Sequence, residues 1–188
     1  MPEHRLKPLT PLGHAAPETV TIGPLTITEV VTTALASLAS RRGRAADVAA
    51  VAAAQGIPLP GPGRVAAGPT YTAFWLGPDQ WMVEAPFASH EDIAAILRPA
   101  FADAASITEQ TDAWARFDLA AADLPALFER LCGFDLRASP TDAATRTVIE
   151  HLGCYLVRRT DTALTIYGPR SSAQSLHHTL TTAARSVY

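Results

Sequence analysis

Hydrophobic and polar positions alternate most clearly on either side of a Gly77-Pro78-Asp79 turn. Proline presets φ for the second position of a turn, and an aspartate side chain can bond its own nearby backbone. The aromatic stretches on either side are therefore predicted to pair as a hairpin. Its apolar side chains divide between two faces, so both faces need cover. One face carries Tyr71, Ala73 and Trp75, and the other carries Thr72, Phe74 and Leu76.

The same pattern predicts further helices and strands along the chain. Amphipathic stripes preceded by capping residues indicate helices, and short β-branched runs indicate strands. The proline- and glycine-rich residues 57–69 are predicted to be a loop. Helices are expected over 33–41 and 45–55 and from Ser89, Asp123 and Ser171. Strands are expected over 25–31, 106–109, 113–119, 147–152, 154–159 and 163–167, with the turn of a second hairpin at Gly153.

This order of elements predicts an α+β fold made of two similar halves. Each half reads as a split β-α-β unit with antiparallel strands, and helices are expected on the outside. The halves cover residues 20–105 and 106–188 of one domain. Residues 1–19 are proline-rich and lack periodicity, so they are predicted to form an extended arm.

Composition limits the classes of function. The chain has 188 residues, is 48% hydrophobic and carries a net charge of −3, so it can bury a core but offers no basic field for nucleic acid or membrane. The apolar runs are too short and interrupted for a membrane span. Residues 1–17 lack the apolar core of a secretory signal, so a cytoplasmic location is expected.

A search for chemistry predicts no catalytic or metal-binding residue and no cofactor bound by this chain. Phosphate-binding glycine motifs are absent, and the adjacent His177 and His178 point about 100° apart on a helix. Cys132 and Cys154 form no Cys-x-x-Cys pair and are interpreted as buried thiols.

Arginines form the one charged cluster of interest. Arg158 and Arg159 alternate on a predicted strand, so they point to opposite faces. A solvated edge strand is the favoured interpretation, with an inward or partner-facing arginine as the alternative. The cluster also includes Arg170, which follows the next turn. The possible subunit interface consists of Trp75, Trp81, Arg158 and Arg170.

Several segments together resemble the gamma subunit of heterotetrameric sarcosine oxidase. The Trp-Leu-Gly-Pro-Asp-Gln-Trp stretch at 75–81 carries most of the resemblance. The other segments are Leu6-Lys7-Pro8-Leu9, Arg41-Arg42-Gly43, Gly56-Ile57-Pro58-Leu59-Pro60, Cys132-Gly133-Phe134-Asp135-Leu136, Thr145-Arg146-Thr147 and 170–176.

That resemblance implies a fold similar to the first, folate-binding domain of the glycine-cleavage T protein, an aminomethyltransferase. It also implies a non-catalytic structural subunit whose partners are alpha, beta and delta subunits. FAD, FMN, NAD, tetrahydrofolate and zinc are then expected in those partners. The family demethylates sarcosine to glycine with release of hydrogen peroxide, and the one-carbon unit passes to tetrahydrofolate.

Two other functions stay open at this point. The first is a free-standing folate-binding or aminomethyl-transfer protein, although no folate-binding residue of the T protein can be matched to a motif here. The second is a scaffold that associates with its own copy through an uncovered sheet face.

Overall fold

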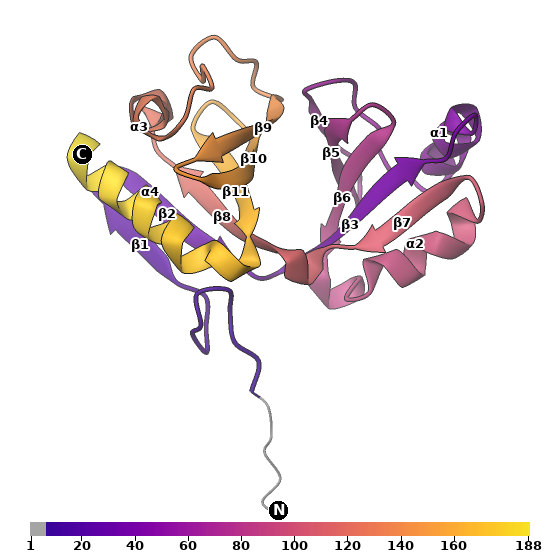
Figure 1. Cartoon of the computed structure of the whole chain (residues 1–188), viewed down its shortest axis with the longest axis horizontal. Helices are drawn as coiled ribbons and strands as arrows, with labels where there is room; N and C mark the ends of the chain where they lie inside the picture. The colour runs from indigo at the N-terminus through magenta and orange to yellow at the C-terminus, as the bar shows by residue number, and fades with distance from the viewer. Residues whose placement is uncertain (1–6) are drawn as a thin grey trace, which may run out of the picture.

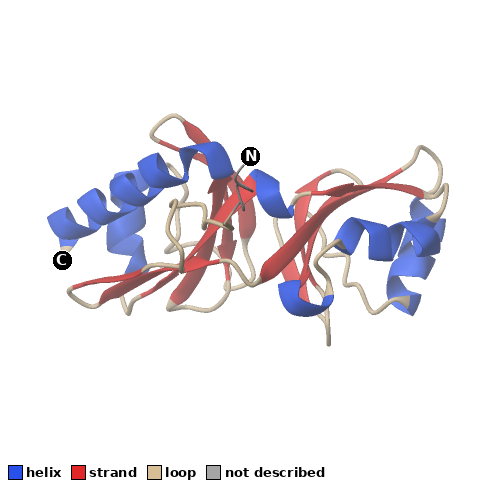
Figure 2. Cartoon of the chain, turned by 90° about the horizontal axis from the view of Figure 1, so that it is seen from below, coloured by secondary structure: helices blue, strands red, loops and turns tan. Residues whose placement is uncertain are grey.

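A computed structural model describes residues 7–188, which fold into two lobes joined side by side (Figure 1). Each lobe is an antiparallel sheet with helices on its outer face, and the inner faces of the two sheets meet at the junction (Figure 2). The predicted α+β class with outer helices is confirmed.

The first lobe contains a sheet in which β4-β5-β6-β3-β7 are neighbours in that order. Helices α1 (Ala45–Ala54) and α2 (Ile93–Phe101) pack on its outer face. Its strands are β3 (Thr33–Ser40), β4 (Val65–Ala67), β5 (Thr72–Gly77), β6 (Gln80–Pro86) and β7 (Ala105–Glu109).

The second lobe contains a sheet in the order β1-β2-β8-β11-β10-β9. Helices α3 (Leu124–Leu131) and α4 (Ala173–Val187) cover its outer face. Its strands are β1 (Thr19–Ile22), β2 (Leu25–Val30), β8 (Trp114–Ala120), β9 (Ala144–Ile149), β10 (Leu152–Arg158) and β11 (Ala163–Pro169). Short 3₁₀ turns lie at Phe87–Ser89, Thr111–Ala113 and Arg170–Ser172.

Strand order relates the two sheets to each other. The series β4-β5-β6-β3 in one sheet corresponds to β9-β10-β11-β8 in the other, and the next position is filled by β7 or by β2. Because β2 pairs with β8, residues 19–30 belong to the sheet of the C-terminal lobe, whereas residues 105–109 belong to the first. Each expected half, 20–105 or 106–188, thus contributes its first residues to the sheet of the other half.

The predicted helix over residues 33–41 is wrong, because this segment is strand β3. It lies between β6 and β7 in its sheet, and its buried residues are Ala34, Leu35, Ala36 and Leu38. A strand covered on both faces has a nearly continuous apolar run, which periodicity alone does not separate from a buried helix.

Smaller corrections concern helix starts and one turn. Helix α2 begins after Asp92, whose carboxylate accepts a hydrogen bond from the Ala95 amide, and not at Ser89. The expected side-chain cap at the start of α4 does not form. The hairpin of β9 and β10 reverses between Ile149 and Leu152, so Gly153 lies inside β10. The cap at Asp123 is present as predicted.

The hairpin of β5 and β6 is confirmed, with its reversal at residues 78–79 and Asp79 at φ 56°. Tyr71 and Ala73 pack in the cluster beneath the helices, whereas Phe74 packs between the two sheets. Both faces of the hairpin are therefore covered within this chain, as its pattern predicted.

The N-terminal arm is expected over residues 1–19, of which 1–6 lie outside the described residues. From residue 7 the chain runs along the second lobe, and Leu12 is buried in the core of that lobe. The buried carboxylate of Glu29 accepts hydrogen bonds from the Leu12 and Glu18 amides. Gln174 donates to the Leu12 carbonyl, so the arm is fixed at several points.

Candidate binding site at the junction of the sheets

A buried carboxylate marks the junction of the two lobes. Glu84, on the inner face of β6, is only 6% exposed. Its Oε1 accepts hydrogen bonds from Nη2 of Arg159 at 2.6 Å and from the hydroxyl of Tyr167 at 2.9 Å. Arg159 follows β10 and Tyr167 lies on β11, so one side chain of the first lobe is held by two of the second.

Arg116 on β8 makes a second connection. Its Nε and Nη2 donate to the two oxygens of Asp118 at 2.9 and 2.8 Å, while Nη1 donates to Thr33 Oγ1, on β3, at 2.7 Å. Thr165 donates to Asp118 and accepts from Arg159 Nε, which links the two arginines. We call Glu84, Arg116, Asp118, Arg159, Thr165 and Tyr167 the junction network.

The surroundings change the pKa of two members of this network, Tyr167 and Arg116. Burial and the neighbouring Glu84 charge raise the pKa of Tyr167, so its hydroxyl stays protonated and donates. Burial alone lowers the pKa of Arg116, but its contacts with Tyr167, Asp118 and Glu84 outweigh that effect and raise it. Two arginines and two carboxylates therefore balance across the junction. No buried side-chain N or O atom of residues 7–188 lacks a hydrogen-bond partner.

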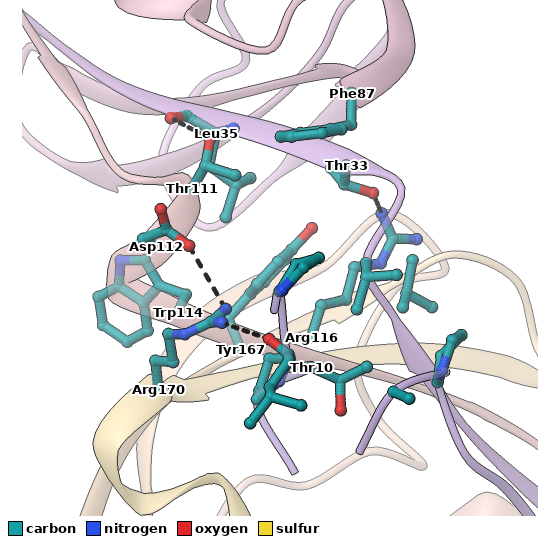
Figure 3. A pocket seen from close by; sticks show the side chains of 17 residues that line it. Thr10, Thr33, Leu35, Phe87, Thr111, Asp112, Trp114, Arg116, Tyr167 and Arg170 are labelled. Atoms are coloured by element: carbon teal, nitrogen blue, oxygen red, sulfur yellow. Dashed lines mark hydrogen bonds and ion pairs between the residues drawn. The ribbon is translucent and has the colours of Figure 1, made fainter. Parts of the chain in front are cut away.

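Beside this network lies a cavity of about 310 Å³ between the lobes and the arm (Figure 3). Its walls combine apolar and aromatic side chains, including Leu35, Phe87 and Trp114, with the Tyr167 ring and Arg116. Residues 8–17 of the arm supply prolines and leucine to one side.

Arg170 closes one edge of the cavity. It lies 3.4 Å from Asp112 and donates to the carbonyl of Leu9 at 3.1 Å, so it joins the arm to the turn before β8 (Figure 3). A cavity with aromatic walls and a few polar groups is suited to binding a small molecule. The lining residues within 7–188 include no Cys, Ser or His.

The structure scatters the residues predicted as a subunit interface. Trp75 and Trp81 pair across the first hairpin, and both are partly buried. Trp81 packs against the core beneath the helices and donates to the Pro60 carbonyl. Of the four, Arg170 alone reaches the junction cavity.

The favoured interpretation of Arg158 and Arg159 as solvated positions on an edge strand is wrong. Strand β10 lies between β11 and β9, and Arg158 is only 8% exposed. Its guanidinium donates to the carbonyls of Leu136 and Ser139 and so holds the loop after α3. Arg159 turns the other way, toward Glu84, which matches the inward alternative.

Sequence reasoning missed Glu84 and Arg116. Glu84 interrupts an apolar strand at a position that alternation assigns to the same face as Met82, and a lone carboxylate there requires a cation. The partners of Glu84 lie more than thirty residues away in the sequence. A charged residue within an apolar strand was therefore the available signal.

Other expected features fall outside the junction. Cys154 is buried and Cys132 partly so, and burial raises the pKa of the Cys154 thiol to about 11. Across residues 7–188, no three or more His, Cys, Asp or Glu side chains gather to hold a metal ion. The helices of that part of the chain are too short or too polar to span a membrane.

Comparison with solved structures first places the chain in a class of fold. The aminomethyltransferase T of the glycine cleavage system from Bartonella henselae matches 84% of this chain and 48% of that one, with a TM-score of 0.59 and 11% identity. The chain thus spans about half of that protein. The α+β architecture with two antiparallel sheets is shared.

A more extensive match is a chain of the heterotetrameric sarcosine oxidase from Corynebacterium sp. U-96, solved with pyrrole 2-carboxylate. It covers 90% of this chain and 88% of that chain, with a TM-score of 0.74 and 24% identity. The resemblance seen in the sequence is thereby confirmed for the fold. Neither protein-family models nor curated proteins give a match to the chain.

Proposed function

We propose that this chain is a non-catalytic structural subunit of a heterotetrameric sarcosine oxidase, corresponding to the gamma subunit. The observation that carries the proposal is the match with one chain of such an enzyme over most of both chains, 90% of this chain and 88% of that one. A structural role agrees with a junction whose arginines and carboxylates bind each other.

In this role the chain completes an assembly that oxidatively demethylates sarcosine to glycine and releases hydrogen peroxide. Its partners are the alpha, beta and delta subunits, which hold FAD, FMN, NAD, tetrahydrofolate and zinc. The one-carbon unit passes to tetrahydrofolate on a partner, and the whole complex works in the cytoplasm. Trp75, Trp81 and Arg170 are partly exposed and remain the proposed contacts with those partners.

Affinity purification of the tagged chain from its native source tests the proposal. We expect a complex of defined stoichiometry whose flavin absorbance elutes together with the chain and which turns over sarcosine. Elution of the chain by itself, with the sarcosine-oxidising activity in a separate fraction, would contradict the proposal.

The junction cavity supports a second candidate, a folate-binding protein. A volume of about 310 Å³ with Trp114 and Tyr167 in its walls is large enough to enclose part of a flat heteroaromatic ligand. Calorimetric titration of the isolated chain with tetrahydrofolate should give saturable heat if this candidate is correct. Absence of heat at high ligand concentration would exclude the folate-binding candidate. The scaffold that associates with its own copy would be excluded by sedimentation of the pure chain as a monomer.

A further inference from the structure

Strand β9 leaves part of its outer edge without a backbone partner. It is the last strand of the second sheet, so within that sheet it pairs with β10 only. The loop before β4 begins a pairing on the other side, where the Ala144 amide donates to the Gly63 carbonyl at 2.9 Å. Beyond Ala144, no backbone hydrogen bond within residues 7–188 reaches this edge. We call the remaining part, residues 145–149, the open edge.

The alternation of an antiparallel ladder identifies the unpaired groups of the open edge. Because the Ala144 amide points away from β10, the amides and carbonyls of Arg146 and Val148 point the same way. The two-residue turn between β9 and β10 requires the same alternation. Within residues 7–188, these four groups form a single hydrogen bond, from the Thr145 hydroxyl to the Arg146 carbonyl at 3.4 Å. Such an edge is a template for pairing with another chain.

Two side chains beside the open edge are also without partners of their own kind. Arg146 and Val148 lie on the same face of β9 as Ala144, which packs between the two sheets. The Arg146 guanidinium lies 6.0 Å from the centre of the Tyr155 ring, and it forms no ion pair or side-chain hydrogen bond within residues 7–188. Val148 is 55% exposed. The open edge thus presents a cation and an apolar side chain two residues apart.

Charge complementarity selects what pairs with the open edge. Side chains directly opposite each other on neighbouring strands interact as pairs, favourably for opposite charges and unfavourably for like charges. An added strand is therefore favoured when it places a carboxylate opposite Arg146 and an apolar side chain opposite Val148. A second copy of this chain that paired through β9 would bring its own Arg146 opposite or diagonal to this one. The arrangement favours a different chain over a second copy.

We propose that the open edge of β9 binds an extended segment of a partner protein as an added antiparallel strand. The backbone of the segment pairs with the amides and carbonyls of Arg146 and Val148. Because the added strand runs opposite to β9, an apolar residue comes first in the segment and covers Val148, and an aspartate or glutamate follows two positions later and binds Arg146. Strand addition of this kind takes its affinity from main-chain hydrogen bonds and its specificity from alternate side chains.

Amide hydrogen exchange of the full chain, followed by NMR, tests this proposal with a synthetic octapeptide in which threonine alternates with valine and glutamate. At saturation we expect exchange of the Arg146 and Val148 amides to slow by at least about tenfold. The Thr147 amide points toward β10 and should change little. A peptide with lysine in place of glutamate should bind about fivefold more weakly. Unchanged exchange at both outward amides, or equal binding of the two peptides, would overturn the proposal.

Two variants and one matched control complete the experiment. Val148→Pro removes an outward amide without touching the ladder with β10, and it should weaken binding of the glutamate peptide by at least about fivefold. Val148→Thr keeps that amide and the β-branched shape, so its binding should stay within about threefold of wild type. Arg146→Glu reverses the charge at an exposed position and should make the lysine peptide the tighter ligand. A retained preference for glutamate in Arg146→Glu would refute the proposal even if Val148→Pro fails to fold.

The same measurement separates the proposal from other occupants and from the proposed assembly. Exchange at Arg146 and Val148 that slows with rising chain concentration, without peptide, would overturn the proposal and assign the open edge to a second copy. The titration uses the isolated chain, so its result is independent of the oxidase. A chain that binds the glutamate peptide but elutes alone from its native source supports the added strand and contradicts the subunit. A chain that elutes in a flavin-containing complex but ignores the peptides supports the subunit and refutes the added strand.

Discussion

Replacing Tyr167 by phenylalanine removes one hydroxyl group from the junction of the two sheets. That hydroxyl donates to Glu84 Oε1 at 2.9 Å, and Glu84 is 6% exposed, so water does not readily take its place. A hydrogen bond to a charged group contributes about 1.5–3 kcal/mol to stability. Because Arg159 continues to bind the same carboxylate, we expect the loss at the lower end, about 2 kcal/mol.

Tyr155→Phe is a matched control for this experiment. Tyr155 is the cross-strand neighbour of Tyr167, and both rings pack against Phe74. The Tyr155 hydroxyl forms no side-chain hydrogen bond within residues 7–188, so its removal should change stability by less than about 0.5 kcal/mol. Urea unfolding followed by tryptophan fluorescence measures both variants. Equal stability of the Tyr167→Phe and Tyr155→Phe variants would refute the hydrogen bond across the junction.

Three further predictions concern other parts of the chain. Burial raises the pKa of Cys154 from its ordinary 9.0 to about 11. The free energy of unfolding should therefore be constant below pH 9 and fall as the pH rises through 11, by at most about 2.7 kcal/mol. The Cys154→Ala variant should lack that part of the pH profile of unfolding. Trp81→Phe removes the indole hydrogen bond and should lower the free energy of unfolding by about 1 kcal/mol, whereas Trp75→Phe should match wild type in urea unfolding. A larger loss in Trp75→Phe than in Trp81→Phe would contradict the placement of the two rings. Gly68→Ala would place a Cβ atom 2.7 Å from a backbone oxygen, so calorimetry should show a loss of roughly 1–3 kcal/mol, and an unchanged melting temperature would exclude that close approach.

Much of the fold follows from local signals in the sequence. The turn at 77–79 is set by proline and aspartate, and the start of α3 by Asp123, so both could be predicted. Strand β3 could not, because its run of alanine and leucine has high helical propensity and only its place between β6 and β7 makes it a strand. The pairing of β2 with β8, which joins residues about ninety apart, likewise depends on tertiary contacts.

The candidate site was less accessible to sequence reasoning. An inward arginine was an open alternative, and Arg159 fulfils it by binding Glu84. Arg116 and Asp118 are two residues apart on the strand predicted over 113–119 and so share a face, and this spacing was an available signal for their ion pair. The cavity itself is formed by the arm, both sheets and Arg170, and no local pattern joins those segments.

The claim that this chain completes an oxidase assembly is tested most directly by reconstitution with and without it. The alpha, beta and delta subunits are co-expressed in both cases, and light scattering after gel filtration gives the mass of the flavin-containing species. We predict a four-subunit complex that oxidises sarcosine when the chain is present, and smaller or aggregated species without it. A stable three-subunit complex with full sarcosine turnover in its absence would contradict the account.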